Sequence, residues 1–250
     1  MNLQVVQVRP APAALASWLQ RLLLPVCEIA RLQPFTFELR PTGLWAGWSM
    51  GSDSSPDYRV CLSNRVVLYS SASLVQVYLH ECAHALLHQV DALREHGHDA
   101  AFFAINLALL ARLDAAQDER LPRTGGRWAT TVTLYDLQDA PASLAEQQPG
   151  AWWPVAAGWS MQVAEELATT DLDAVALARE ICTRYSAWCA KLQANVEARK
   201  IAQQRDLEER AQRHEEQVRA DARLAIRLMC LAFAGVGAVA VTLGNWIAHH

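Results

Sequence analysis

Five of the chain's eight histidines lie between residues 74 and 103. Two of them belong to the run His80-Glu81-Cys82-Ala83-His84, in which the imidazoles are four residues apart. That spacing places both rings on one face of a helix. A helical H-E-x-x-H motif is how zinc hydrolases bring two imidazoles to the metal and turn the glutamate toward a bound water. The motif predicts His80 and His84 as metal ligands and Glu81 as the general base.

A third ligand has to come from elsewhere in the stretch. His88 shares the face but lies about 12 Å along the helix axis from His80, too far to join one ion through bonds of ~2.0–2.1 Å. His98 follows a glycine and precedes a second helical pattern, so a turn there can bring it back to the first helix. We expect His98 to be the third ligand, with His96 as the second choice. Cys82 lies on another side of the helix and is expected to be buried and inert.

The rest of the first 190 residues reads as helices with a short sheet. Residues 12–32 form an amphipathic pattern, and residues 35–40, 43–50 and 58–63 are strand-like and separated by turn residues. These three segments predict one small sheet. Residues 141–154 are interpreted as a loop rich in tryptophan.

The C-terminal part divides into two segments. Residues 191–227 contain no Pro or Gly and predict a solvated helical stalk. A 4,3,4 spacing of Leu207, Ala211, His214 and Val218 allows only a weak homodimer through the stalk and the segment that follows it.

Residues 228–248 carry no charge over about the length that a helix needs to cross a bilayer. They predict one C-terminal transmembrane helix, and a buried core helix is the alternative. Arginines precede this segment and none follows it, so the positive-inside rule predicts a single-pass protein of the cell membrane with its catalytic domain in the cytoplasm.

Composition excludes several classes of protein. The net charge of −4 provides no basic field for nucleic acid. The six cysteines form no C-x-x-C pair, which argues against a zinc ribbon and a disulfide scaffold. The N-terminus has no charged leader followed by an apolar run, so no signal peptide is expected.

The run from Tyr58 to Phe103 resembles the catalytic segment of SprT-like zinc metalloproteases. The matching residues are Cys61 to Asn64 before the H-E-x-x-H helix, His80 to His84 on it, and His98 to Phe102 after it. The resemblance implies one zinc ion held by His80, His84 and His98, with Glu81 as general base. It also implies a protein or peptide substrate, extended against a strand near residues 58–63.

Together these features predict an α+β fold. A small zincin-like metalloprotease domain of helices with a short β-sheet at residues 1–190 is followed by a stalk at 191–227 and a transmembrane helix at 228–248. The expected function is that of a membrane-anchored zinc metallopeptidase. Two alternatives stay open: a non-catalytic membrane-anchored zinc-binding adaptor, and an ImmA/IrrE-type regulatory peptidase with Glu165 or Glu166 as third ligand.

Overall fold

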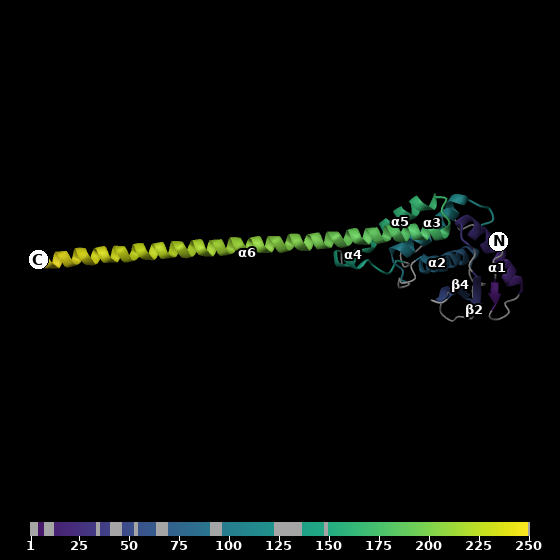
Figure 1. Ribbon diagram of the computed structural model, residues 1–250, viewed down its shortest axis with the longest axis horizontal. Helices are drawn as coiled ribbons and strands as arrows, with labels where there is room; N and C mark the ends of the chain where they lie inside the picture. The colour runs from purple at the N-terminus through teal and green to yellow at the C-terminus, as the bar shows by residue number, and fades with distance from the viewer. Residues whose placement is uncertain are drawn as a thin grey trace. The chain divides into compact units, whose positions relative to one another are not determined.

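The computed structural model describes residues 5–7, 13–33, 36–40, 47–52, 55–63, 70–90, 97–122, 137–147 and 150–249. The chain divides into two compact units, Met1–Gln193 and Ala194–His250 (Figure 1). The first unit contains every residue of the predicted metal site that the structure describes, so its helices and strands determine the geometry of that site.

Helix α1 spans Ala13–Ala30 and confirms the amphipathic helix predicted in this region. The residue after its end is Arg31, a non-glycine residue with a φ of 55°. The N–H of Leu32 donates to the carbonyl of Cys27 at 2.9 Å, and the N–H of Arg31 donates to Glu28 at 3.2 Å. This pairing is a Schellman motif, which satisfies carbonyls that the last helical turn would leave without partners.

The sheet contains four strands: β1 (Val5–Gln7), β2 (Thr36–Arg40), β3 (Gly47–Ser52) and β4 (Ser55–Ser63). Their order is β1-β2-β4-β3. Strands β1, β2 and β4 are parallel, whereas β3 is antiparallel to β4. Strand β4 includes the segment predicted to bind a peptide, but β2 and β3 already occupy its two sides. That assignment is wrong, because the edges of the described sheet belong to β1 and β3.

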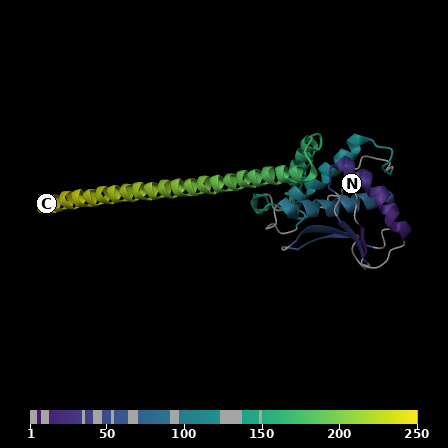
Figure 2. The same cartoon turned by 45° about the vertical axis from the view of Figure 1, so that its right-hand side comes forward.

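The helices of the first unit pack in layers on this sheet. Helix α2 (Ser71–Val90) contacts β3 and β4, and Figure 2 shows the sheet on one side of this helix. Helix α3 (Ala100–Ala116) packs on α1 and α2, and α5 (Trp153–Ala168) packs on α3. A short helix, α4 (Ala142–Gln147), lies in the segment interpreted from the sequence as a loop. Helices α2 and α3 are therefore central and supply about half of the core cluster.

Arg112 on α3 joins several helix ends. Its side chain is buried, with 5% exposed, and its guanidinium donates to the carbonyls of Ala30 at 3.0 Å and Leu172 at 2.8 Å. Longer bonds of 3.4 Å reach Ala168 and Thr170. Burial, followed by the neighbouring Arg31, lowers the pKa of Arg112 below its usual value. The fork of an arginine suits this position because it satisfies several carbonyls at once.

Helix α6 spans Ala174–His249 and has 76 residues. Asp173 caps its start by accepting from the N–H of Ala176 at 2.7 Å. Residues 197–236 of this helix are exposed, and Leu207 is 61% exposed. Pairs of opposite charge one turn apart, such as Asp206 with Arg210 at 2.8 Å, follow this part of the helix. The predicted stalk is thus helical, and the weak homodimer stays a prediction.

The prediction of a transmembrane helix is corrected by the structure. Within the described residues, no helix offers a stretch of sufficient length and apolar character to cross a membrane. Residues 228–248 are not a separate helix but the last part of α6, continuous with the charged turns before them. The membrane anchor, and with it the predicted location of a single-pass protein, is therefore not supported.

The predicted fold class is also wrong. The described chain is mostly helical, and its strands have between 3 and 9 residues. Helix α6 alone exceeds the four strands together in length. A mainly helical protein replaces the α+β fold with a C-terminal transmembrane helix.

Candidate metal centre

Helix α2 positions two of the three predicted ligands. It begins beside Ser70, whose hydroxyl accepts from the N–H of Ser73 at 3.1 Å. Fully buried side chains such as Leu74, Tyr78 and Leu79 fix its orientation in the core. His80 and His84 follow on one face one turn apart, and their ring centroids are 5.0 Å apart.

The third ligand comes from the start of α3. His98 lies in a short non-helical stretch, and Asp99 behind it is the N-cap of that helix. The Asp99 carboxylate accepts from the N–H groups of Ala101 at 2.9 Å and Phe102 at 3.0 Å. Such a cap satisfies two of the backbone donors that have no partner within a helix. The cap fixes where α3 begins and hence where His98 leaves it.

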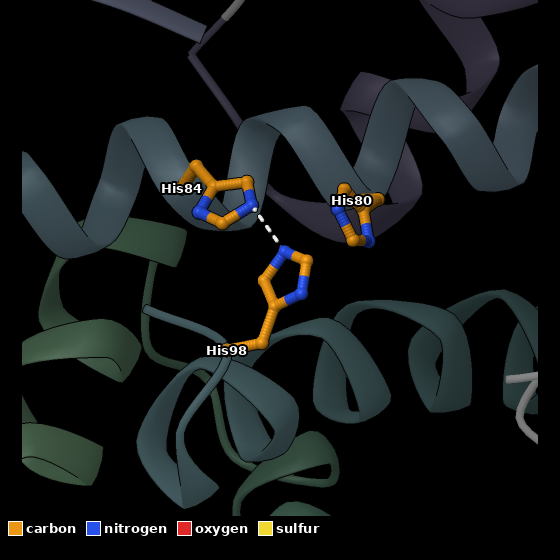
Figure 3. A group of neighbouring side chains, drawn as sticks. All are labelled: His80, His84 and His98. Atoms are coloured by element: carbon orange, nitrogen blue, oxygen red, sulfur yellow. Dashed lines mark hydrogen bonds between the residues drawn. The ribbon is translucent and has the colours of Figure 1, made fainter. Parts of the chain in front are cut away.

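The three imidazoles converge (Figure 3). The Nε2 atoms of His84 and His98 are 3.0 Å apart, and one nitrogen from each ring lies within 4.8 Å of the others. Ligand nitrogens of a tetrahedral zinc ion with bonds of ~2.0–2.1 Å are separated by about 3.3 Å. The 3.0 Å between the two Nε2 atoms and the 4.8 Å limit for the whole group lie on either side of this separation. His80, His84 and His98 are therefore positioned to hold a metal ion.

The protonation state of His80 suits this role. Burial, followed by the charge of the neighbouring His98, lowers the pKa of His80 from 6.5 to about 4. An imidazole binds a metal only when it is neutral. Because the pKa lies well below 7, His80 is ready to coordinate at physiological pH without losing a proton first.

Phe102 forms the wall against which the three rings pack. Its side chain is fully buried. The ring stacks on His84 at 4.2 Å and on His98 at 4.8 Å, and it meets His80 edge-on at 4.9 Å. One aromatic side chain thus orients all three imidazoles and excludes water from one side of the centre.

Glu81 follows His80 directly on α2 and is buried, with 6% of its surface exposed. It is not among the side chains grouped as metal ligands. One residue of helix corresponds to a rotation of roughly 100°, so Glu81 projects from the flank of the face that carries His80 and His84. A carboxylate beside the ligands, rather than among them, fits the expected role of a base.

The other candidate ligands that the structure describes are not part of this centre. His88 is buried on α2 and does not belong to the group of ligating side chains in the described residues. Cys82 is buried, as expected, and burial raises the pKa of its thiol well above 9.0. Glu166 pairs with Arg184 at 2.7 Å. His96 lies outside the described residues.

Asp139, which the sequence did not identify, and Gly97, the glycine before His98, complete the surroundings of that ligand. Asp139 accepts from the backbone N–H of His98 at 2.8 Å through its Oδ2 atom. Gly97 lies against the same carboxylate. No local pattern signals Asp139, because it is 41 positions from the histidine that it contacts.

The fold and the site define a mainly helical protein with a three-histidine centre able to hold a metal ion. No family model, curated protein or solved structure matches the chain. The resemblance to SprT-like metalloproteases therefore stays a prediction drawn from the motif residues.

Proposed function

We propose that this protein is a zinc-dependent metallopeptidase. The observation that carries the proposal is the convergence of His80, His84 and His98 beside the buried carboxylate of Glu81. Three imidazoles with a fourth position left for water are the ligand set of catalytic rather than structural zinc. The resemblance of the same residues to SprT-like proteases supports this reading.

The proposed chemistry gives each residue one task. His80, His84 and His98 would hold zinc, which polarises a water molecule and the substrate carbonyl when it is bound. Glu81 takes the proton of the attacking water and passes it to the leaving amine. Phe102 keeps the three imidazoles in place from the buried side. Hydrolysis then consumes one water for each peptide bond broken.

The sheet supports a peptide as the substrate. Strand β3 is at an edge of the described sheet and is antiparallel to β4. It also contacts α2, the helix that carries two of the ligands. An extended peptide that pairs with the edge of β3 would run beside this helix. We infer that β3, rather than β4, is the strand that binds the substrate.

The non-catalytic adaptor is the second candidate. A structural zinc site is closed by four protein ligands, whereas the described residues provide a group of three. The regulatory peptidase with a glutamate as third ligand is less favoured, because His98 already supplies that ligand and Glu166 pairs with Arg184. The ligand count therefore favours catalysis.

The deciding experiment combines metal analysis with peptide digestion. The purified wild type should contain one zinc per chain and cleave peptides in a proteome-derived library read by mass spectrometry. Glu81→Gln should keep the zinc and lose cleavage by about 100-fold or more, because only the base is removed. Glu119→Gln, which changes an exposed glutamate after α3, is the matched control and should cleave normally.

Two further variants test the ligand set. His98→Ala should lose zinc, whereas His88→Ala should keep it. A wild-type protein that binds zinc and cleaves no peptide would favour the adaptor. Undiminished cleavage by Glu81→Gln would rule out Glu81 as the base.

A further inference from the structure

We propose that Asp139 and Gly97 form a latch that positions His98 for the metal, so that Asp139 controls the affinity of the centre without coordinating the ion. This inference rests on the metal site of the proposed function. Asp139 is a positioning residue, because it contacts the backbone of a ligand and not the ion or the substrate.

His98 needs such support more than the other ligands do. His80 and His84 lie within α2 and are held by the hydrogen bonds of that helix. His98 precedes α3 and has no helix of its own. Its ring must nevertheless bring one nitrogen within 4.8 Å of nitrogens of the other two rings. The backbone at His98 therefore determines whether three ligands meet.

The segment ending at Asp139 holds both polar groups of that backbone. The Asp139 carboxylate accepts the N–H of His98 at 2.8 Å. In return, the carbonyl of His98 accepts from the N–H of Gln138 at 2.9 Å and from the N–H of Asp139 at 3.2 Å. Three hydrogen bonds on one residue fix its position and its orientation together.

This segment is itself anchored on both sides. Leu137, which precedes it, is buried in the core. After it, the carbonyl of Pro141 accepts from the N–H groups of Leu144 and Ala145 at the start of α4, and Leu144 is also buried. The latch therefore ties His98 to the core rather than to a free loop.

Because Gly97 has no side chain, the Asp139 carboxylate can approach the backbone N–H of His98. A Cβ atom at this position would overlap the Asp139 Oδ2 atom and would lie 3.2 Å from its Cγ atom. The conflict is with the end of a side chain, which can rotate away. An alanine at position 97 should therefore break the hydrogen bond to His98 while leaving the fold intact.

The latch makes a specific prediction for pairs of variants. Asp139→Ala removes the acceptor, and Gly97→Ala displaces it, so each should weaken zinc binding by about tenfold or more, as loss of a residue that orients a ligand does. Asp139→Asn keeps an amide oxygen as acceptor and should restore most of the affinity. In the double variant the alanine at position 97 meets no carboxylate, so its affinity should equal that of Asp139→Ala.

The experiment measures zinc affinity of the full chain by competition with a chromophoric chelator. Cobalt(II) is then substituted, because its visible spectrum reports the number of ligands. Asp139→Ala and Gly97→Ala should shift the cobalt spectrum toward that of His98→Ala, while their thermal midpoints without metal stay at the wild-type value. Gly158→Ala is the matched glycine control, because nothing lies near a Cβ there, and it should bind as the wild type does.

The outcomes separate the two proposals. Wild-type affinity and spectrum in both single variants would overturn the latch and leave the peptidase untouched. Additive losses in the double variant would also overturn it, because the two changes would then act independently. Zinc binding without any peptide cleavage by the wild type would overturn the peptidase while leaving the latch to be judged by affinity alone.

Discussion

At the scale of single residues, the centre depends on Phe102 as well as on its ligands. The ring contacts all three imidazoles and is fully buried. Replacing it with alanine should cost about 3–5 kcal/mol of stability. Because the imidazoles lose their shared wall, Phe102→Ala should also weaken zinc binding.

The neighbouring Phe103 provides the control for this prediction. It is 3% exposed and points roughly 100° away around the same helix. Phe103→Ala should lose a similar amount of stability and keep its zinc affinity. Chemical denaturation and chelator competition measure the two quantities separately. Equal zinc affinities in the two variants would show that Phe102 acts only through the core.

The motif allowed some residues of the site to be predicted from the sequence and not others. His80 and His84 follow from spacing on one helix, and His98 follows from a turn at the start of another. The structure brings these three together. Asp139 could not be predicted, because its carboxylate accepts the backbone N–H of His98 from 41 positions away. A contact over that separation leaves no local pattern in the sequence.

At the scale of elements, Arg112 is the main connection between helix ends. Its guanidinium donates hydrogen bonds to carbonyls at the ends of α1 and α5 and before the start of α6. Arg112→Met should destabilise the protein by about 3 kcal/mol or more, because buried carbonyls lose their charged donor. The stability of Arg112→Lys should lie between those of the wild type and Arg112→Met, since an ammonium keeps the charge but lacks the planar fork of donors.

A surface arginine gives the comparison. Arg120 pairs with Glu28 at 3.0 Å and with Asp118 at 2.7 Å, but it is exposed and screened by water. Arg120→Met should shift the urea midpoint far less than Arg112→Met does. Similar shifts of the urea midpoint in Arg112→Met and Arg120→Met would mean that the bonds to buried carbonyls stabilise the protein no more than exposed ion pairs do.

Local patterns predicted the elements better than their pairing. The helix at α1 and the strands that became β2, β3 and β4 were visible as periodic runs. Strand β1 has 3 residues, too few for a period to show. The order β1-β2-β4-β3 arises from contacts between distant segments, which local patterns do not predict.

At the scale of the whole molecule, the sequence was misleading about proportions and about the C-terminus. The strands have distinct sequence patterns although they are short, but helices dominate the described chain. The length and lack of charge of the C-terminal run predict a membrane span. In the structure this run continues α6, and no helix of the described residues is long and apolar enough to cross a membrane.

The division into two units leads to the final prediction, that a chain ending at Gln193 keeps the metal centre. The first unit, Met1–Gln193, contains His80, His84 and His98 together with the latch at Asp139. Its core cluster ends at Ile181, with Leu192 the last residue packed against it. The contacts of Phe102 and Asp139 with the ligands lie within the first unit. The shortened chain should therefore bind one zinc with the affinity of the full chain.

Limited trypsin digestion provides an independent measurement on the intact protein. The arginines and lysines between residues 199 and 227 are exposed, and a solvated helix opens locally far more easily than a packed core. Trypsin should cut there first and leave a fragment near the size of the first unit that retains zinc. Loss of zinc from that fragment, or from the chain ending at Gln193, would show that the second unit supports the centre.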